Sequence, residues 1–212
     1  QHLTTRRQRQ MCIRDRAMTA TPIPRTLAIT YNGDMDISII DELPKNRPEI
    51  HTSFIEKDNL STAYNFIRDQ IKEGGQTIIV YPVISESEKH DLSAAEESYN
   101  YLRETIFPDQ NIGLVHGKLD DEDKNDAMKE FMNGKTNILV STTVVEVGID
   151  NPSANVILIN NCERFGLSQM HQLRGRVGRG TLESYCLLHS DSESSNTKDR
   201  LNILVNSRNG FE

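Results

Sequence analysis

The feature that most constrains the fold is a regular alternation of short apolar runs with longer amphipathic segments. Apolar runs of up to about five residues without polar alternation predict strands covered on both faces, as in a parallel sheet, whereas the segment 49–55 alternates and predicts a further strand. Strands that alternate with helices of about 12 to 16 residues predict βαβ units. The predicted strands span 49–55, 76–81, 112–115, 137–141, 155–159 and 184–188, and the predicted helices span 59–73, 92–107, 120–132, a stretch from about 168, and 195–206.

Right-handed crossovers between such units predict an α/β fold with a doubly wound, mostly parallel β-sheet and helices on both faces. A length of 212 residues suffices for one such core. Residues 1–16 differ from the rest, with five arginines and no apolar period, and we interpret them as a disordered or foreign N-terminal segment. The folded domain is then expected to span 17–212.

Composition limits the partners that the chain can have. No apolar run approaches the roughly 20 residues that cross a bilayer, so no membrane partner is expected. The cysteines Cys12, Cys162 and Cys186 have no metal-binding spacing and fit a reducing cytoplasm. The net charge of −7 argues only weakly against nucleic acid, because a local basic strip decides such binding. Any DNA contact must therefore be narrow.

Three arginines and three glycines are interleaved between Gln169 and Gly180. The guanidinium forks of Arg174, Arg176 and Arg179 fit phosphate oxygens, and the glycines allow backbone to approach a ligand closely. An Arg/Gly loop solvated on the surface is the alternative. The pattern makes the segment the first candidate for a phosphate-binding site.

Polar residues also follow predicted strands. Ser141-Thr-Thr-x-x-Glu-x-Gly148-x-Asp150 offers hydroxyls and backbone N–H groups to a phosphodiester, and Asp150 can accept from a ribose hydroxyl. Ordinary helix capping is the alternative. Lys118, two residues after His116, can meet a phosphate, whereas His116 itself is interpreted as structural. Because ligands of doubly wound sheets bind outside the carboxyl ends of strands, we expect the candidate loops at that edge.

The sequence lacks several other kinds of site. Gly134-Lys-Thr136 imitates the end of a P-loop, but position 129 is Lys129 where the motif needs glycine, and the segment follows a helix. This disfavours a P-loop kinase or GTPase. The sequence also has no Asp-Glu-x-His box for Mg²⁺, no serine elbow and no metal-binding His pair.

The motifs resemble those of one helicase family. Gln172-x-x-Gly175-Arg176-x-Gly178-Arg179 resembles the arginine-finger motif of superfamily 2 helicases, and 141–150 resembles their motif V. His116-Gly-Lys-Leu119 resembles a DNA-facing segment, Thr19-Ala-Thr21 resembles motif III, and 81–84 lies where motif IV is expected. The strings at 18–28, 33–44 and 163–180 resemble the RecA-like second motor domain of the RecG family of branched-DNA helicases, and the likeness covers about residues 17–212.

This resemblance implies an ATP-dependent DNA helicase of repair and recombination, with ATP between two motor domains. It assigns catalytic roles to Arg176, Arg179 and Gln172, and it adds Gly148 and Asp150 to the two arginines as nucleotide ligands. It also assigns contacts with the DNA backbone to Thr142, Thr143, Lys118, Thr19 and Thr21.

The resemblance further implies that the chain is a fragment. ATP and Mg²⁺ would be bound mainly by a first motor domain, which is absent along with the wedge domain that splits branched DNA. The domain is expected to be incomplete at its C-terminus, and the isolated chain is expected to be inactive as an ATPase.

Two alternatives remain. Transcription-repair coupling translocases share the 18–26 and 172–179 strings, although Ile-Asp41-Glu-Leu-Pro44 favours the RecG family. The other alternative is a non-catalytic nucleic-acid-binding module, against which the presence of Arg176 and Arg179 argues.

Overall fold

The computed structural model describes residues 38, 48–82, 88–142, 151–192 and 194–206. Apart from Ser38, these residues belong to one compact unit that begins at Ile40. The expected boundary between residues 16 and 17 and the expected incomplete C-terminal end both lie outside the described residues.

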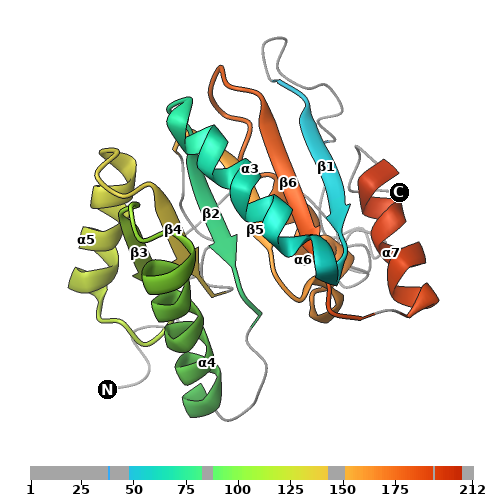
Figure 1. The fold of residues 1–212 in the computed structure, drawn as a ribbon, viewed down its shortest axis with the longest axis horizontal. Helices are drawn as coiled ribbons and strands as arrows, with labels where there is room; N and C mark the ends of the chain where they lie inside the picture. The colour runs from blue at the N-terminus through green and yellow to red at the C-terminus, as the bar shows by residue number, and fades with distance from the viewer. Residues whose placement is uncertain (1–37, 39–47, 83–87, 143–150, 193, 207–212) are drawn as a thin grey trace, which may run out of the picture. The chain divides into compact units, whose positions relative to one another are not determined.

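A six-stranded parallel sheet forms the centre of this unit, with the strand order β1-β6-β5-β2-β4-β3. Figure 1 shows the strand arrows pointing the same way. The strands are β1 (Ile50–Ile55), β2 (Gln76–Val80), β3 (Ile112–Val115), β4 (Ile138–Ser141), β5 (Ala154–Ile159) and β6 (Ser184–His189). Each lies within two residues of its predicted bounds, so the predicted α/β fold with a doubly wound parallel sheet is confirmed.

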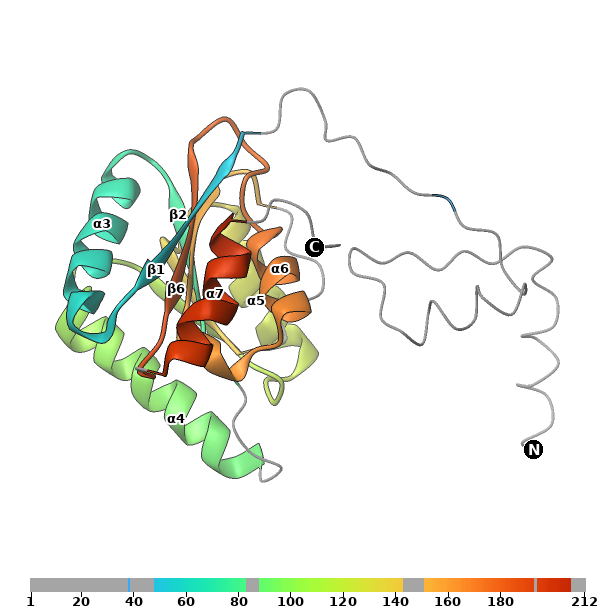
Figure 2. The same ribbon diagram turned by 90° about the vertical axis from the view of Figure 1, so that its right-hand side faces the viewer.

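Helices cover both faces of the sheet, as Figure 2 shows, with α3 and α4 on one side and α5, α6 and α7 on the other. Their bounds are α3 (Leu60–Lys72), α4 (Glu88–Tyr101), α5 (Asp121–Met132), α6 (Leu167–Arg174) and α7 (Ser195–Asn206), with short turns η2 (Lys57–Asn59), η3 (Leu102–Ile106) and η5 (Cys162–Arg164). No helix among the described residues is long and apolar enough to cross a membrane.

Local signals explain where these helices begin and end. The Asp120 carboxylate accepts from the Asp123 N–H at 2.8 Å and caps α5, a bond that satisfies a donor left open at a helix start. Gly134 (φ +74°) follows α5 and Gly74 (φ +92°) follows α3, both in the left-handed conformation that glycine tolerates best.

The predicted helix over 92–107 begins earlier, at Glu88, and changes its winding at its end. The Phe107 N–H donates to the Leu102 carbonyl at 2.7 Å, which is the i to i+5 bond of a π-turn. Both side chains of this bonded pair are buried. The sequence pattern marked the end of the helix but not the wider turn that packs these two side chains.

The core lies in two layers, one on each face of the sheet. Ile78 and Ile157 face α5, α6 and α7, whereas their neighbours Ile79 and Leu158 face α3 and the π-turn. Neighbouring side chains of a strand point to opposite faces, and both faces are buried here. This explains why the central strands carry consecutive apolar residues, at 78–80 in β2 and 156–159 in β5.

Candidate functional site

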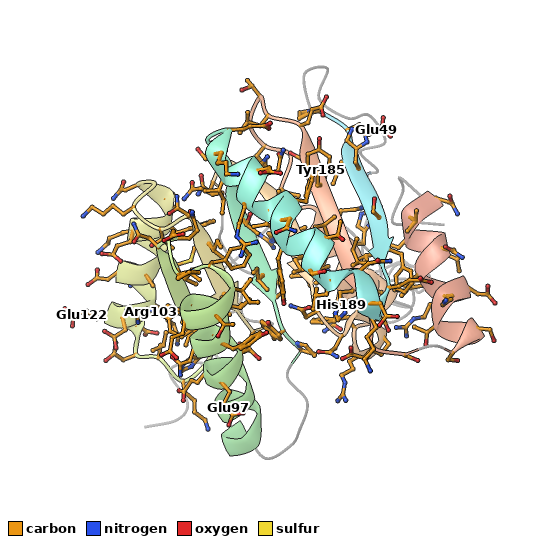
Figure 3. The ribbon with its side chains drawn as sticks, in the orientation of Figure 1. Glu49, Glu97, Arg103, Glu122, Tyr185 and His189 are labelled. Carbon is orange, nitrogen blue, oxygen red and sulfur yellow. The ribbon has the colours of Figure 1, made fainter. Side chains whose placement is uncertain are left out.

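The parallel sheet has two chemically distinct edges. All strands begin at one edge, which we call the amino edge, and end at the other, the carboxyl edge. Figure 3 shows the contrast, because Glu49, just before β1, and His189, the last residue of β6, lie at opposite ends of the sheet. Each candidate residue can therefore be assigned to an edge.

Residues 175–180, which we call the arginine loop, lie at the amino edge. A Cβ at Gly178 (φ +76°) would be 3.0 Å from Cγ1 of Ile50, the first residue of β1. A Cβ at Gly180 would be 2.1 Å from the carbonyl oxygen of Pro152, two residues before β5. Gly180 is therefore required by a close backbone contact, and Gly178 by its positive φ and by the nearby Ile50 side chain.

The expectation that this loop lies at the carboxyl edge is therefore wrong. The loop follows α6, and a helix that follows a parallel strand returns the chain to the edge where strands begin. The rule for ligands at carboxyl ends applies to loops that directly follow strands.

The three arginines of the motif are not equivalent. Arg174 is 7% exposed, and its Nη1 donates to the Leu204 carbonyl at 2.8 Å. Val177 is fully buried and anchors the loop. Arg176 is half-buried and Arg179 is exposed, so neither is a core residue. Gln172 is half-buried on α6.

The described residue that follows the nucleotide candidates of motif V in the sequence lies at the same edge. Gly148 and Asp150 lie outside the described residues, but Asn151 follows Asp150 directly and is buried at the amino edge. Its Nδ2 donates to Oε1 of Gln76, the first residue of β2, at 3.0 Å. The residue after Asp150 and the arginine loop therefore lie at one edge.

The two DNA-contact candidates that the structure describes, Thr142 and Lys118, lie at the opposite edge. Thr142 follows β4 and is 4% exposed; its N–H donates to the Val115 carbonyl at 3.3 Å, and its carbonyl accepts from Ser141 Oγ. Its backbone donor is therefore already used within the fold. Lys118, after β3, is exposed. Thr143, Thr19 and Thr21 lie outside the described residues.

His116 has a structural place beside Lys118. Its ring is buried, its Nδ1 accepts from the Lys118 N–H at 3.3 Å, and its Nε2 lies 3.8 Å from a Glu96 carboxylate oxygen. Burial lowers the pKa of His116, and Glu96 opposes that effect. The side chain holds the turn that presents Lys118.

Burial changes the ionisation of three further residues. It raises the pKa of Tyr81, at the position of motif IV, and Ser98 of α4 opposes that effect. Burial raises the pKa of Cys162 and Cys186 to about 12, which excludes thiolate nucleophiles at neutral pH for these two residues.

The arginine loop fits a phosphate-bearing ligand. An exposed and a half-buried arginine flank glycines, and Gly178 and Gly180 lie close to the starts of β1 and β5. Among the described residues, no group of three or more His, Cys, Asp or Glu side chains could hold a metal ion, so we assign none of them to Mg²⁺.

Comparison with known proteins identifies the family of the chain. The model of the helicase conserved C-terminal domain family matches residues 58–181. The chain is 53% identical to the ATP-dependent DNA helicase RecG of Synechocystis sp. and 48% identical to that of Thermotoga maritima; both matches cover 92% of this chain, but only 24% and 25% of those proteins.

A solved structure of RecG bound to a three-way DNA junction matches 92% of this chain and 25% of its own, with 46% identity and a TM-score of 0.76. The chain thus spans about a quarter of the length of the relatives it matches. It belongs to the helicase conserved C-terminal domain family, and its sequence and fold are similar to those of RecG helicases, as its motifs predicted.

Proposed function

We propose that this chain acts as the second motor domain of a cytoplasmic ATP-dependent branched-DNA helicase of DNA repair and recombination. The observation that carries the proposal is the arginine loop. Val177 anchors it in the core while Arg176 and Arg179 stay outside the core, next to the turn that follows Asp150. Its relatives are named ATP-dependent DNA helicases.

In this proposal the amino edge faces the nucleotide. ATP would supply the phosphoryl group whose hydrolysis drives the motor. Arg176 and Arg179 would stabilise the negative charge that develops on its terminal phosphate, an effect worth roughly 10³–10⁵ in rate for arginine fingers. Gln172 would help to orient them, and Gly148 and Asp150 would hold the nucleotide.

The sequence contains no P-loop and no Mg²⁺-binding box, so a first motor domain would provide both. That domain would hold most of the ATP and Mg²⁺, and a wedge domain would engage the branch. The isolated chain is then expected to show no ATPase activity.

The carboxyl edge would face DNA. At this edge Lys118 would contact a backbone phosphate, and the Thr142 hydroxyl would donate to the DNA backbone without reading bases. Thr143, Thr19 and Thr21, which lie outside the described residues, are proposed as further contacts with the DNA backbone. Nucleotide and DNA would then lie at opposite edges of the sheet. Closure of the cleft between the two motor domains around ATP, at the amino edge, would move the DNA contacts at the carboxyl edge.

Complementation tests the proposal. Synechocystis RecG that lacks its matching region would be mixed with this chain, and ATPase activity measured with branched DNA. We expect activity only in the mixture, because each half lacks part of the pocket. Arg179→Ala should abolish it, while Arg103→Ala, an exposed arginine on η3, should not.

Three results would contradict the proposal. ATPase activity of the pure chain would refute the split pocket. A mixture without activity would favour a non-catalytic nucleic-acid-binding module. Stimulation only by double-stranded DNA without a branch would favour a translocase of the transcription-repair coupling type.

A further inference from the structure

A buried junction of two amides lies at the amino edge. Asn151 is 2% exposed and Gln76 is 4% exposed. Asn151 Nδ2 donates to Gln76 Oε1 at 3.0 Å and to the Phe131 carbonyl at 3.3 Å. Gln76 Nε2 donates to the carbonyls of Phe131 and Thr136 at 2.7 and 2.6 Å. The pair thus joins the start of β2 to the end of α5 and to the approach to β4.

This junction fixes the turn formed by residues 151–153. Asn151 Oδ1 accepts from the Ser153 N–H at 3.0 Å, and the Ser153 carbonyl accepts from the Gln76 N–H at 2.8 Å. The nitrogen and the oxygen of both side-chain amides are therefore hydrogen-bonded. A fully satisfied buried network holds its members in one geometry.

The 151–153 turn contacts the arginine loop. The space beside Gly180 is filled by the Pro152 carbonyl oxygen, which a Cβ would approach to 2.1 Å. In the sequence the turn directly follows Asp150, a residue of the proposed nucleotide site. The arginine loop therefore lies against a turn that Asn151 holds.

We infer that Asn151 is a positioning residue of the nucleotide pocket. By fixing the 151–153 turn, it sets the place of the arginine loop at the amino edge, because Gly180 of that loop lies against the Pro152 carbonyl. The catalytic part of this inference rests on the proposed function. The structural part, that Asn151 holds the arginine loop through the 151–153 turn, can be tested independently of that function. A displacement of about 1 Å in a pre-organised site can lower a rate about 100-fold.

A second buried asparagine provides a matched control. Asn155 is also 2% exposed, and its Nδ2 donates to Gln70 Oε1 at 2.7 Å and to the Glu183 carbonyl at 3.3 Å. It ties α3 and the start of β6 to the sheet. Truncation of either asparagine removes a buried amide of the same size, but only Asn151 holds the 151–153 turn.

The first experiment measures amide hydrogen exchange in the isolated 212-residue chain. Asn151→Ala should speed exchange within residues 176–180 by about tenfold relative to the core strands, whereas Asn155→Ala should not. Gly180→Ala is a second variant, which pushes on the Pro152 carbonyl without removing a hydrogen bond. Gly180→Ala should also speed exchange within residues 176–180. This variant keeps the test valid if Asn151→Ala fails to fold.

The second experiment measures ATPase kinetics in the complemented mixture. Asn151→Ala should lower kcat by about tenfold or more with little change in the affinity for branched DNA, because the arginines are displaced and the DNA edge is intact. Asn155→Ala should leave kcat near that of the unmodified chain.

The outcomes separate the two proposals. If Asn151→Ala and Asn155→Ala speed amide exchange within residues 176–180 equally, Asn151 does not hold the arginine loop. This conclusion would stand whatever ATPase activity the mixture shows. If Asn151→Ala speeds exchange within residues 176–180 but leaves kcat unchanged, Asn151 is not a positioning residue of the nucleotide pocket. If the unmodified mixture has no activity, the proposed function fails, while the exchange comparison still decides whether Asn151 holds the arginine loop.

Discussion

The Nη1 of Arg174 donates to the backbone carbonyl of Leu204 at 2.8 Å and so ties the end of α6 to α7. A second nitrogen of the same guanidinium lies 3.1 Å from Nδ1 of His171. Burial lowers the pKa of Arg174 below its usual value. The first arginine of the motif therefore serves the fold, in contrast to Arg176 and Arg179.

Replacement of Arg174 should therefore destabilise the domain. Arg174→Met keeps much of the side-chain volume but leaves the Leu204 carbonyl without its donor, which costs about 1–3 kcal/mol. Arg179→Ala, at an exposed position, should change the free energy of unfolding by less than about 0.5 kcal/mol. Urea unfolding of both variants measures the difference, and equal values would show that Arg174 is not part of the core.

The contact between Gly178 and Ile50 can be isolated with a second glycine. Gly178 and Gly134 have nearly the same φ, +76° and +74°, so alanine at either position carries the same backbone strain of about 1 kcal/mol. Only at Gly178 would the new Cβ meet a side chain, at 3.0 Å from Ile50 Cγ1, whereas nothing lies within 4 Å at Gly134.

Gly178→Ala should thus be more destabilising than Gly134→Ala in urea unfolding. In the Ile50→Ala background the extra cost should disappear, because the clashing atoms are gone. If the two glycine variants stay unequal in that background, the arginine loop is held against β1 by something other than this contact.

The alternation of apolar runs sufficed to predict the sheet because parallel strands buried on both faces leave a clear pattern. β3 was predicted at its observed bounds, and β2 ended one residue earlier than expected. The motifs likewise identified the arginine loop. The edge on which that loop lies was missed, because position depends on the direction in which α6 returns the chain.

Other features left no signal in the sequence. Asn151 and Gln76 are 75 positions apart, and only the fold brings their amides within 3.0 Å. Arg174 has the same residue type as Arg176, two positions away, yet the helix turns it inward. A sequence pattern assigns residue types to a loop, whereas burial decides which of them stabilise it.

Two buried histidines make stability depend on pH. Burial lowers the pKa of His116 and His189 below the ordinary 6.5, with Glu96 opposing the effect at His116 and Asp191 and Glu163 opposing it at His189. The unfolded chain then binds protons that the folded chain does not, so stability is complete above pH 6.5 and falls as the pH drops below it.

Urea unfolding between pH 7.5 and 5 should show this decrease, and the variant with both His116→Gln and His189→Gln should lose most of it. Replacement of the exposed His51 by glutamine serves as the control and should leave the decrease unchanged. A double variant with the full slope would mean that other groups cause it.

The assignment of DNA to the carboxyl edge predicts a specific loss of salt dependence. Each phosphate contact adds about 0.9 to the slope of log K against log salt concentration for duplex DNA. Lys118 is exposed at the carboxyl edge, and Lys129 is exposed near the end of α5, toward the amino edge. Lys118→Gln should lower the slope by about 1, while Lys129→Gln should leave it unchanged. Both slopes can be measured by fluorescence anisotropy of a labelled three-way junction that is titrated with the chain at several salt concentrations. A larger effect of Lys129→Gln than of Lys118→Gln would place the DNA at the amino edge and contradict the assignment.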